Sequence, residues 1–174
     1  MKTVVTGGTG FIGSHLVKSL LEQNREVIVA SDLSRLGSEN LSGLGVKPSD
    51  IELREADLSD YHQALTAIAG ADSVFHLAAR VGSLEYLHAT EMAELNALQT
   101  NLVIDANVFR ACLEKGIKKT IYASSCAVYP MDKQFSPGAI FPESCLELSP
   151  RDFLKPIAAG SGQRTINPDG GYGW

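Results

Sequence analysis

A chain of 174 residues has the usual size of one domain, and its hydrophobic content of 44% is enough for a sizeable core. Fifteen Lys and Arg residues against twenty Asp and Glu residues give a net charge of −5, which offers no long-range attraction to nucleic acid or to anionic membranes. No apolar run approaches the roughly 18 residues that span a bilayer. We therefore expect neither nucleic acid nor a membrane as a partner.

The beginning of the sequence, MKTVVTGGTG, becomes glycine-rich where an export signal would carry its apolar stretch. The three cysteines are Cys112, Cys126 and Cys145, and their wide spacings fit neither a disulfide framework nor a metal site. These features favour a reducing, cytoplasmic compartment and predict no metal ligation.

Short apolar runs rich in β-branched residues alternate with amphipathic stretches along most of the chain. The pattern predicts strands at 2–6, 26–31, 51–53, 73–77 and 120–124, with helices at 11–23, 61–69 and 91–115. Strands that read as continuous apolar runs are typical of parallel sheets shielded by helices on both sides. We therefore predict an α/β fold of the Rossmann type, with a doubly wound, mostly parallel sheet and helices on both faces.

Prolines gather late in the chain, since six of the seven follow Tyr129. We interpret residues 131–171 as a proline-rich loop or insertion near a cleft rather than as a second domain. The whole chain, 1–174, is then expected to be one dinucleotide-binding domain.

Three glycines stand as GxxGxxG between the first predicted strand and the first predicted helix: Gly7, Gly10 and Gly13. A tight strand-to-helix turn needs a residue without Cβ at Gly7, and a pyrophosphate can approach closely only if Gly10 also lacks one. Gly13 lets the helix pack on the strand, and the helix N-terminus then faces the anion. This placement predicts a dinucleotide-binding turn.

Acidic residues follow the second and third predicted strands. Asp32 comes 19 residues after Gly13, near the spacing at which a carboxylate accepts hydrogen bonds from the adenosine ribose. The negative charge of Asp32 favours NAD over NADP, although Arg35 can weaken that preference. The alternative interpretation is that Asp32 is a solvated turn residue. Asp57 is placed either to reach the adenine edge or to be the N-cap of the helix that begins near Tyr61.

Several segments share the pattern of one known family: TGGTGFIG at 6–13, ADL at 56–58, HLAA at 76–79, the pair Asn101 and Asn107, and SSCAVY at 124–129. Together they resemble the extended short-chain dehydrogenase/reductase family, in particular its NAD-dependent nucleotide-sugar epimerases and dehydratases. The resemblance runs along most of the chain. It implies a domain that binds NAD and a separate C-terminal substrate domain that this chain lacks.

The resemblance also implies positions around the cofactor. Phe11 and Ile12 are expected under the pyrophosphate, Asp57 and Leu58 at the adenine, and Asn101 near the nicotinamide. With the glycine turn, the expected NAD-binding residues are Gly7, Gly10, Phe11, Ile12, Gly13, Asp32, Arg35, Asp57, Leu58, Leu77, Ala78, Ala79, Arg80, Asn101 and Ser124. His76 is interpreted as a core residue without a functional role.

For catalysis, the resemblance implies that the Ser125 hydroxyl binds the substrate oxygen and that Tyr172 is the base. In the family a lysine follows this tyrosine by four positions and lowers its pKa, and here that position lies two residues beyond Trp174. We therefore expect a truncated chain that binds NAD but turns over poorly, with Tyr172 protonated.

The residue after the expected catalytic serine separates reaction types. Cys126 and Ala127 stand where the family's 4,6-dehydratases carry acidic residues, which favours an epimerase. In GDP-mannose 3,5-epimerases a cysteine one place later handles protons, so Cys126 is a candidate catalytic residue. The alternative is a small residue that lines the pocket.

The leading hypothesis is an epimerase that acts on a nucleotide sugar, with a UDP-sugar and its C4 favoured, through reversible hydride transfer to NAD. The alternatives are a reductase or dehydratase of the same family, and a non-catalytic NAD-binding protein. The resemblance implies a homodimer for the complete protein, formed by the helix that ends near Lys115 and a helix that begins near Tyr172. For this chain alone we expect a weaker dimer or a monomer.

Overall fold

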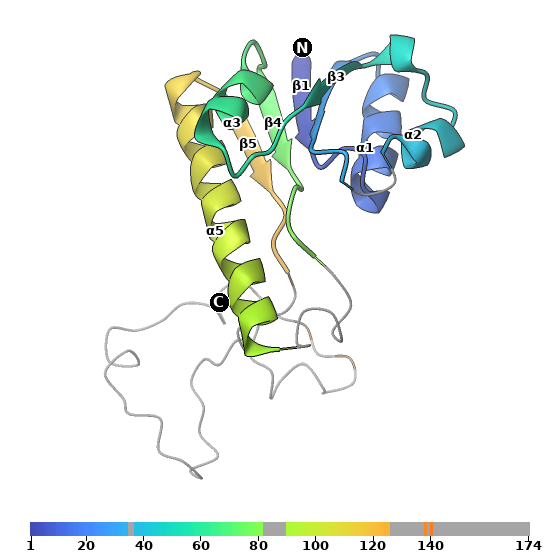
Figure 1. The fold of residues 1–174 in the computed structure, drawn as a ribbon. Helices are drawn as coiled ribbons and strands as arrows, with labels where there is room; N and C mark the ends of the chain where they lie inside the picture. Colours follow the sequence, from blue (N-terminus) through green and yellow to red (C-terminus); the bar gives the residue numbers. More distant parts are fainter. Residues whose placement is uncertain (35–36, 82–89, 126–137, 139, 141–174) are drawn as a thin grey trace. The chain divides into compact units, whose positions relative to one another are not determined.

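The computed structural model describes residues 1–34, 37–81, 90–125, 138 and 140 (Figure 1). The strands and helices described below lie within Met1–Ala123, and Ser124 begins a second unit. Three predicted site residues, Arg35, Cys126 and Tyr172, lie outside the described residues. The assignment of 1–174 to one domain and of 131–171 to a loop or insertion stays a prediction.

The described elements follow the predicted alternation of strands and helices. In chain order they are β1 (Lys2–Thr6), α1 (Phe11–Glu22), β2 (Glu26–Ser31), α2 (Glu39–Gly43), a 3-10 turn (Pro48–Asp50), β3 (Glu52–Glu55), α3 (Tyr61–Ile68), β4 (Ser73–His76), α5 (Glu91–Glu114) and β5 (Lys119–Tyr122). Each predicted element is present, with its ends displaced by at most two residues. The sequence analysis missed α2 and the 3-10 turn, because α2 buries only Leu41 and the turn buries none of its residues.

The five strands form one parallel sheet in the order β3-β2-β1-β4-β5. This is the strand order of a Rossmann fold, and it confirms the predicted fold class. The chain reverses its direction of winding between β1 and β4, which are neighbours in the sheet but about 70 residues apart in sequence. In such sheets the crevice beyond the carboxyl ends of the strands at this point is the usual ligand site.

Helices cover both faces of the sheet, with α1 and α2 on one side and α3 and α5 on the other (Figure 1). Alternate strand residues enter the two cores, so Val4 and Ile28 pack towards α3 and α5, while Val5 and Val29 pack towards α1 and α2. Burial on both faces explains why β1 and β2 are continuous β-branched runs.

Candidate functional site

The turn between β1 and α1 depends on the absence of side chains. Gly7 has φ +67°, and a Cβ on it would lie 2.9 Å from both Cα and N of Ala78, just beyond β4. A Cβ on Gly13 would overlap the carbonyl oxygen of Gly7, and one on Gly10 would lie 3.2 Å from the same oxygen. The predicted need for glycine at Gly7 and Gly13 is confirmed, although Gly13 packs against the turn itself rather than against the strand.

A fourth glycine in this turn was missed by the sequence analysis. A Cβ on Gly8 would lie 2.9 Å from Cγ1 of Val29 and 3.1 Å from the carbonyl oxygen of Val5. Gly8 therefore keeps the turn close to β1 and β2. Its position next to Gly7 was the available signal, but the three-glycine pattern does not include it.

The N-terminus of α1 opens directly from this turn. Gly10 is the N-cap of α1 and has no side chain with which to cap the helix. The first turn of α1 carries no acidic residue. The side chains of Phe11 and Ile12 are 76% and 71% exposed. The positive end of the helix dipole is therefore available to an anion, and Phe11 and Ile12 can meet it through their backbone amides.

Asp32 directly follows β2 and is exposed. Its Oδ1 accepts hydrogen bonds from the backbone N–H of Ser34 (3.1 Å) and from the Ser34 hydroxyl (2.9 Å). Asp32 thus lies in an exposed turn, which agrees with both of its interpretations. Within the described ranges both bonds use Oδ1, which leaves Oδ2 for the expected ribose contact, and that contact stays a prediction.

Asp57 is not the N-cap of α3, so that alternative was wrong. The cap is Asp60, whose side chain accepts a hydrogen bond from the Gln63 N–H at 3.0 Å, because the helix begins at Tyr61. Asp57 Oδ1 instead accepts from the N–H (2.9 Å) and hydroxyl (2.7 Å) of Ser59. These bonds hold the exposed Asp57 carboxylate in a tight turn at the end of β3.

The side chain of Leu58 is 4% exposed and belongs to the core beneath α3 and α5. Any contact of Leu58 with adenine must therefore come from its backbone. Asn107, on α5, donates hydrogen bonds to the carbonyl oxygens of Leu58 (3.1 Å) and Ser59 (2.8 Å). Asn107 is thus a structural residue that fixes this turn.

The segment after β4, Leu77–Arg80, lies beside the glycine turn and is tied to it. Backbone N–H groups of Leu77 and Ala78 donate to the Thr6 hydroxyl oxygen at 3.1 and 3.2 Å. Asn101 accepts from the N–H of Arg80 at 2.6 Å and donates to its carbonyl oxygen at 3.2 Å. Asn101 therefore holds this segment in place from α5, and its expected contact with nicotinamide stays a prediction. The expected contacts of Leu77, Ala78, Ala79 and Arg80 with the middle of the cofactor also stay predictions.

His76 is the satisfied core residue that the sequence predicted. It is 1% exposed, and its two ring nitrogens lie 2.7 Å from Thr6 Oγ1 and 3.0 Å from Asp105 Oδ1. Burial lowers the pKa of His76, against the opposing effect of the Asp105 carboxylate, which favours the neutral ring.

The expected catalytic residues are only partly described. Ser124 and Ser125 follow β5 in the chain, directly after Ala123. Cys126 and Tyr172 lie outside the described residues. The roles of all four residues stay predictions.

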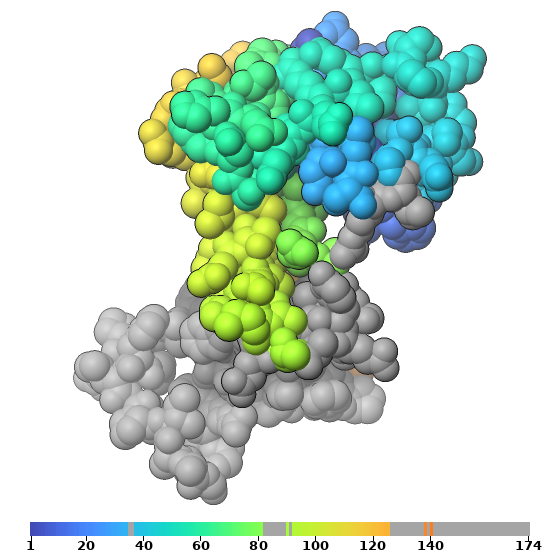
Figure 2. Space-filling model, in the orientation of Figure 1, coloured from blue at the N-terminus to red at the C-terminus, as the bar shows by residue number. Residues whose placement is uncertain are grey.

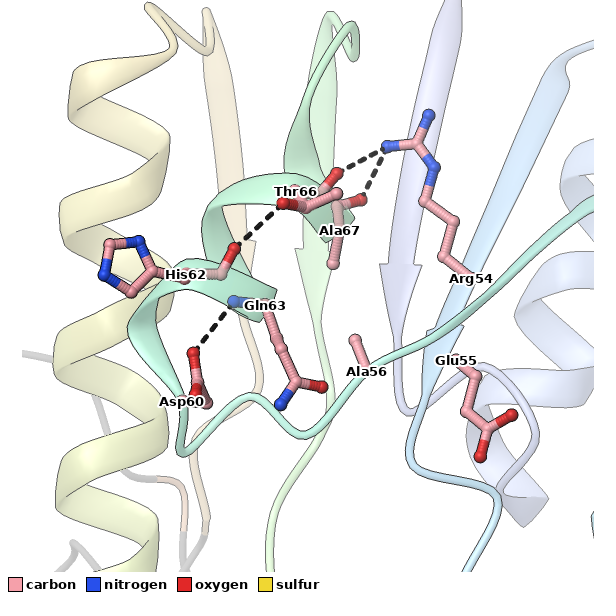
Figure 3. Close-up of a pocket in the computed structure, with 8 residues that line it drawn as sticks. All are labelled: Arg54, Glu55, Ala56, Asp60, His62, Gln63, Thr66 and Ala67. Carbon is pink, nitrogen blue, oxygen red and sulfur yellow. Dashed lines mark hydrogen bonds between the residues drawn. The ribbon is translucent and has the colours of Figure 1, made fainter.

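A hollow of about 540 Å³ lies away from the glycine turn, between β3 and α3 (Figure 3). Arg54 lines it, and its Nη1 donates to the carbonyl oxygens of Thr66, Ala67 and Ala69 at 3.1, 2.9 and 2.8 Å. The guanidinium thus caps the carboxyl end of α3, and its other nitrogens bind Glu52. We assign the hollow a structural role, because the guanidinium of Arg54 in its lining is bound to protein groups.

Other features of the described part bear on the expected partners. None of its helices is long and apolar enough to cross a membrane. It contains no group of three His, Cys, Asp or Glu side chains arranged to hold a metal ion. Cys112 is a buried free thiol, and burial raises its pKa. The cytoplasmic location stays a prediction.

Comparison with known proteins decides the family. A model of the NAD dependent epimerase/dehydratase family matches residues 3–151. The chain belongs to this family. The NAD dependent epimerase/dehydratase family is thus the one that the glycine turn and the other motifs resemble.

Curated relatives include enzymes of more than one kind. A 2-alkyl-3-oxoalkanoate reductase of Stenotrophomonas maltophilia (strain K279a) is 34% identical over 131 residues, which cover 74% of this chain and 34% of the relative. A UDP-glucose 4-epimerase of Bacillus subtilis (strain 168) is 27% identical over 187 residues, covering 99% of this chain and 54% of the relative. The chain therefore spans between a third and about half of the length of these two relatives.

Among solved structures, the UDP-glucose 4-epimerase of Thermus thermophilus in complex with NAD matches with a TM-score of 0.67 and 27% identity. The match covers 83% of this chain and 43% of that one. Fold and family therefore agree, whereas the reductase and the epimerases that the chain resembles differ in reaction.

Proposed function

We propose that this chain is the NAD-binding part of a nucleotide-sugar epimerase, most closely of the type that inverts C4 of a UDP-sugar. The observation that carries the proposal is the open N-terminus of α1 at the crossover between β1 and β4, framed by glycines that admit no Cβ. The epimerase relative and the NAD-bound epimerase structure support the same reaction type.

The residues present fit NAD. The turn at Gly7, Gly10 and Gly13 leaves room for a pyrophosphate beside the first amides of α1, where the helix dipole favours negative charge. Asp32 at the end of β2 and Asp57 at the end of β3 are exposed carboxylates that can accept from ribose hydroxyls and from the adenine amine. A carboxylate at Asp32 repels a 2′-phosphate, which favours NAD over NADP.

When bound, NAD supplies reversible acceptance of hydride from the sugar carbon. In the proposed reaction the Ser125 hydroxyl donates a hydrogen bond to the reacting sugar oxygen, and the Tyr172 phenolate takes the hydroxyl proton. Cys126, next to Ser125, is a candidate for a further proton transfer. Inversion through a keto sugar, with the hydride chemistry that bound NAD would supply, would give the epimer without net oxidation.

The 174 residues alone are proposed to bind NAD but to turn over poorly. A tyrosine has an ordinary pKa of about 10, and in them no lysine stands four positions after Tyr172 to lower it. A protonated phenol cannot take the substrate proton.

Calorimetric titration with NAD tests the cofactor part of the proposal. We expect saturable binding by the 174-residue chain and its loss in Gly10→Val, whose side chain would fill the space beside the Gly7 carbonyl oxygen. Gly43→Ala in α2 is the matched control, because a Cβ there meets nothing within 4 Å. Equal binding by the wild-type chain and Gly10→Val would contradict the proposed cradle.

The complete protein tests the reaction type. Interconversion of UDP-glucose and UDP-galactose without a net change in nicotinamide absorbance would support the epimerase. The second candidate is a reductase, favoured by the identity of 34% to the oxoalkanoate reductase. A stoichiometric change in nicotinamide absorbance with a carbonyl substrate would favour it instead.

We also propose that the complete protein is a homodimer that uses α5. Much of this helix is visible on the surface in Figure 2. Large apolar residues spaced three, four or seven positions apart form an exposed stripe along it, hereafter the α5 stripe: Leu95, Leu98, Leu102, Phe109 and Leu113. A helix face of this kind is typical of helix-to-helix association, and a second copy offers the same stripe.

A further inference from the structure

The last register positions of β1, β4 and β5, next to the proposed cofactor site, carry a row of polar side chains. Thr6, His76 and Tyr122 are register partners on β1, β4 and β5. Asp105 on α5 binds two of them, because its Oδ1 lies 3.0 Å from His76 Nε2 and its Oδ2 accepts from the Tyr122 hydroxyl at 2.8 Å. One carboxylate thus joins the carboxyl ends of two neighbouring strands.

The donors and acceptors in this row fix the direction of each hydrogen bond. The Thr6 hydroxyl oxygen already accepts from the backbone N–H groups of Leu77 and Ala78, so its own hydrogen is free to be donated to His76 Nδ1 at 2.7 Å. His76 Nδ1 is then an acceptor, and the neutral ring carries its hydrogen on Nε2, which donates to Asp105. Every group in the row is satisfied in one arrangement.

Aromatic packing lies against the buried His76 in the same row, whereas Tyr122 is 49% exposed. Phe109 lies one helical turn after Asp105 and packs edge-on against the rings of His76 and Tyr122, with centroid distances of 5.8 and 5.4 Å. The His76 side chain is fully buried, and that of Asp105 is 22% exposed. Removing one partner of a buried hydrogen bond is costly in free energy, because the group left behind cannot form a hydrogen bond with water instead.

Each strand of this row leads directly into the proposed site. β1 continues into the glycine turn at Gly7, β4 into Leu77–Arg80 and β5 into Ala123 and the two serines. We propose that Asp105 is a positioning residue that holds the ends of β4 and β5 together and so sets the nicotinamide half of the NAD site. This inference rests on the proposed NAD-binding function.

The proposal is tested by comparing the effects of a substitution on the binding of two ligands, NAD and ADP. ADP contains the adenosine and pyrophosphate, which the glycine turn, Asp32 and Asp57 are proposed to bind, but it lacks the nicotinamide riboside. We expect Asp105→Ala to weaken NAD binding about tenfold and ADP binding less than about twofold, measured by calorimetry on the 174-residue chain. Glu114→Gln is the matched control, because it changes an exposed α5 carboxylate that binds Arg110 at the carboxyl end of the helix.

A second variant keeps the test available if Asp105→Ala does not fold. Tyr122→Phe removes one hydroxyl, preserves the ring that packs on Phe109, and leaves the bond between His76 and Asp105. We expect it to weaken NAD binding about threefold and to weaken ADP binding, again, by less than about twofold. Long-range ¹H–¹⁵N spectra of His76 supply an independent readout, with the hydrogen on Nε2 in the wild type and no single tautomer in Asp105→Ala.

The outcomes separate the two proposals. A wild-type chain that binds ADP and NAD, together with folded variants that bind NAD as the wild type does, would overturn the role of Asp105 and leave the proposed function standing. Equal losses for NAD and ADP would also overturn it, because they indicate a general structural effect. A wild-type chain that binds no NAD would instead contradict the proposed function.

Discussion

Gly13 lies so close to the carbonyl oxygen of Gly7 that a Cβ atom on it would overlap that oxygen. The first turn of α1 therefore packs directly against the turn that follows β1. Any residue other than glycine at position 13 would require the backbone to move. This contact places the helix N-terminus at the end of the central strand, where an anion can bind.

Gly13→Ala is expected to destabilise the fold by about 1–3 kcal/mol, because the methyl group must displace a backbone carbonyl. NAD binding should weaken with it, since the amides of α1 move away from the turn. Urea unfolding and calorimetric titration measure the two effects. Gly43→Ala is the control, and unchanged or increased stability is expected there, because alanine is the better helix former in open space. Equal stability of Gly13→Ala and the wild type would mean that the turn relaxes at no cost.

Asp32→Asn should change the choice of cofactor. Loss of the negative charge removes the repulsion of a 2′-phosphate and weakens the bonds to the ribose, so we expect NAD affinity to fall about tenfold and the ratio of NADP to NAD affinity to rise. Ser34→Ala is the control for the turn, because it removes one donor to Asp32 and keeps the carboxylate. An unchanged ratio of affinities in Asp32→Asn would exclude Asp32 from the ribose contact.

Arg54→Ala is expected to lower stability by about 1–2 kcal/mol without changing NAD affinity, because the carboxyl end of α3 loses its donor to three carbonyl oxygens. Arg54→Lys should recover little of this, since one ammonium cannot bind both the helix end and Glu52. Lys18→Ala, an exposed cation on α1, serves as the control in urea unfolding. A weaker affinity of Arg54→Ala for NAD would give the hollow in Figure 3 a role in binding.

The pH dependence of the free energy of unfolding should reflect the protonation of His76. Burial lowers its pKa in the folded chain below the ordinary value of about 6.5, so below that pH the unfolded chain binds the proton and the folded chain does not. Stability is then fully present above about pH 6.5 and is lost as the pH falls towards the folded pKa. Thr6, Asp105, Tyr122 and Phe109 are the groups that face the ring.

Unfolding in urea at several pH values measures this effect. His76→Gln should be less stable at neutral pH and should show a flatter profile between about pH 5 and 7. His62→Gln, on the exposed face of α3, is the control substitution. A wild-type profile that is flat in this range would contradict a neutral His76.

Association through the α5 stripe is tested with Leu102→Glu, since Leu102 is 59% exposed in the middle of the stripe. We expect weak, concentration-dependent dimers of the 174-residue chain in sedimentation, and monomers of the variant, because a buried unpaired carboxylate is costly. Leu53→Glu changes a comparably exposed leucine on β3 and should leave association unchanged. Dimers that persist in Leu102→Glu would place the interface elsewhere.

The secondary structure could be predicted because the buried parallel strands are uninterrupted apolar runs, as at Val27–Val29, and the helices between them are long enough to show their period. The prediction for β3 was least accurate. Its run is broken by Glu52, Arg54 and Glu55, since an edge strand faces water and carries charges.

Side-chain contacts were harder to predict than elements. The glycine turn was found because its spacing reflects a local backbone need, whereas Asp60 and Asp57 are both suitable caps and only the exact start of α3 separates them. The bond from Asp105 to His76 joins residues 29 positions apart, and it depends on the register of β4 and on the rotation of α5. Neither the register of β4 nor the rotation of α5 can be deduced from a local sequence pattern.

The position of β1 in the middle of the sheet also governs the order in which the chain can fold. β1 can pair with β2 as soon as Ser31 has been made, but its other edge waits for β4, and the backbone N–H of Lys2 is bound by Asp72, 70 residues later. Contacts of such long sequence separation form slowly, and until they form the central strand has one open edge. On the ribosome, the crossover between β1 and β4 can therefore form only after β2 and β3 have been made, and only β5 joins the described sheet later.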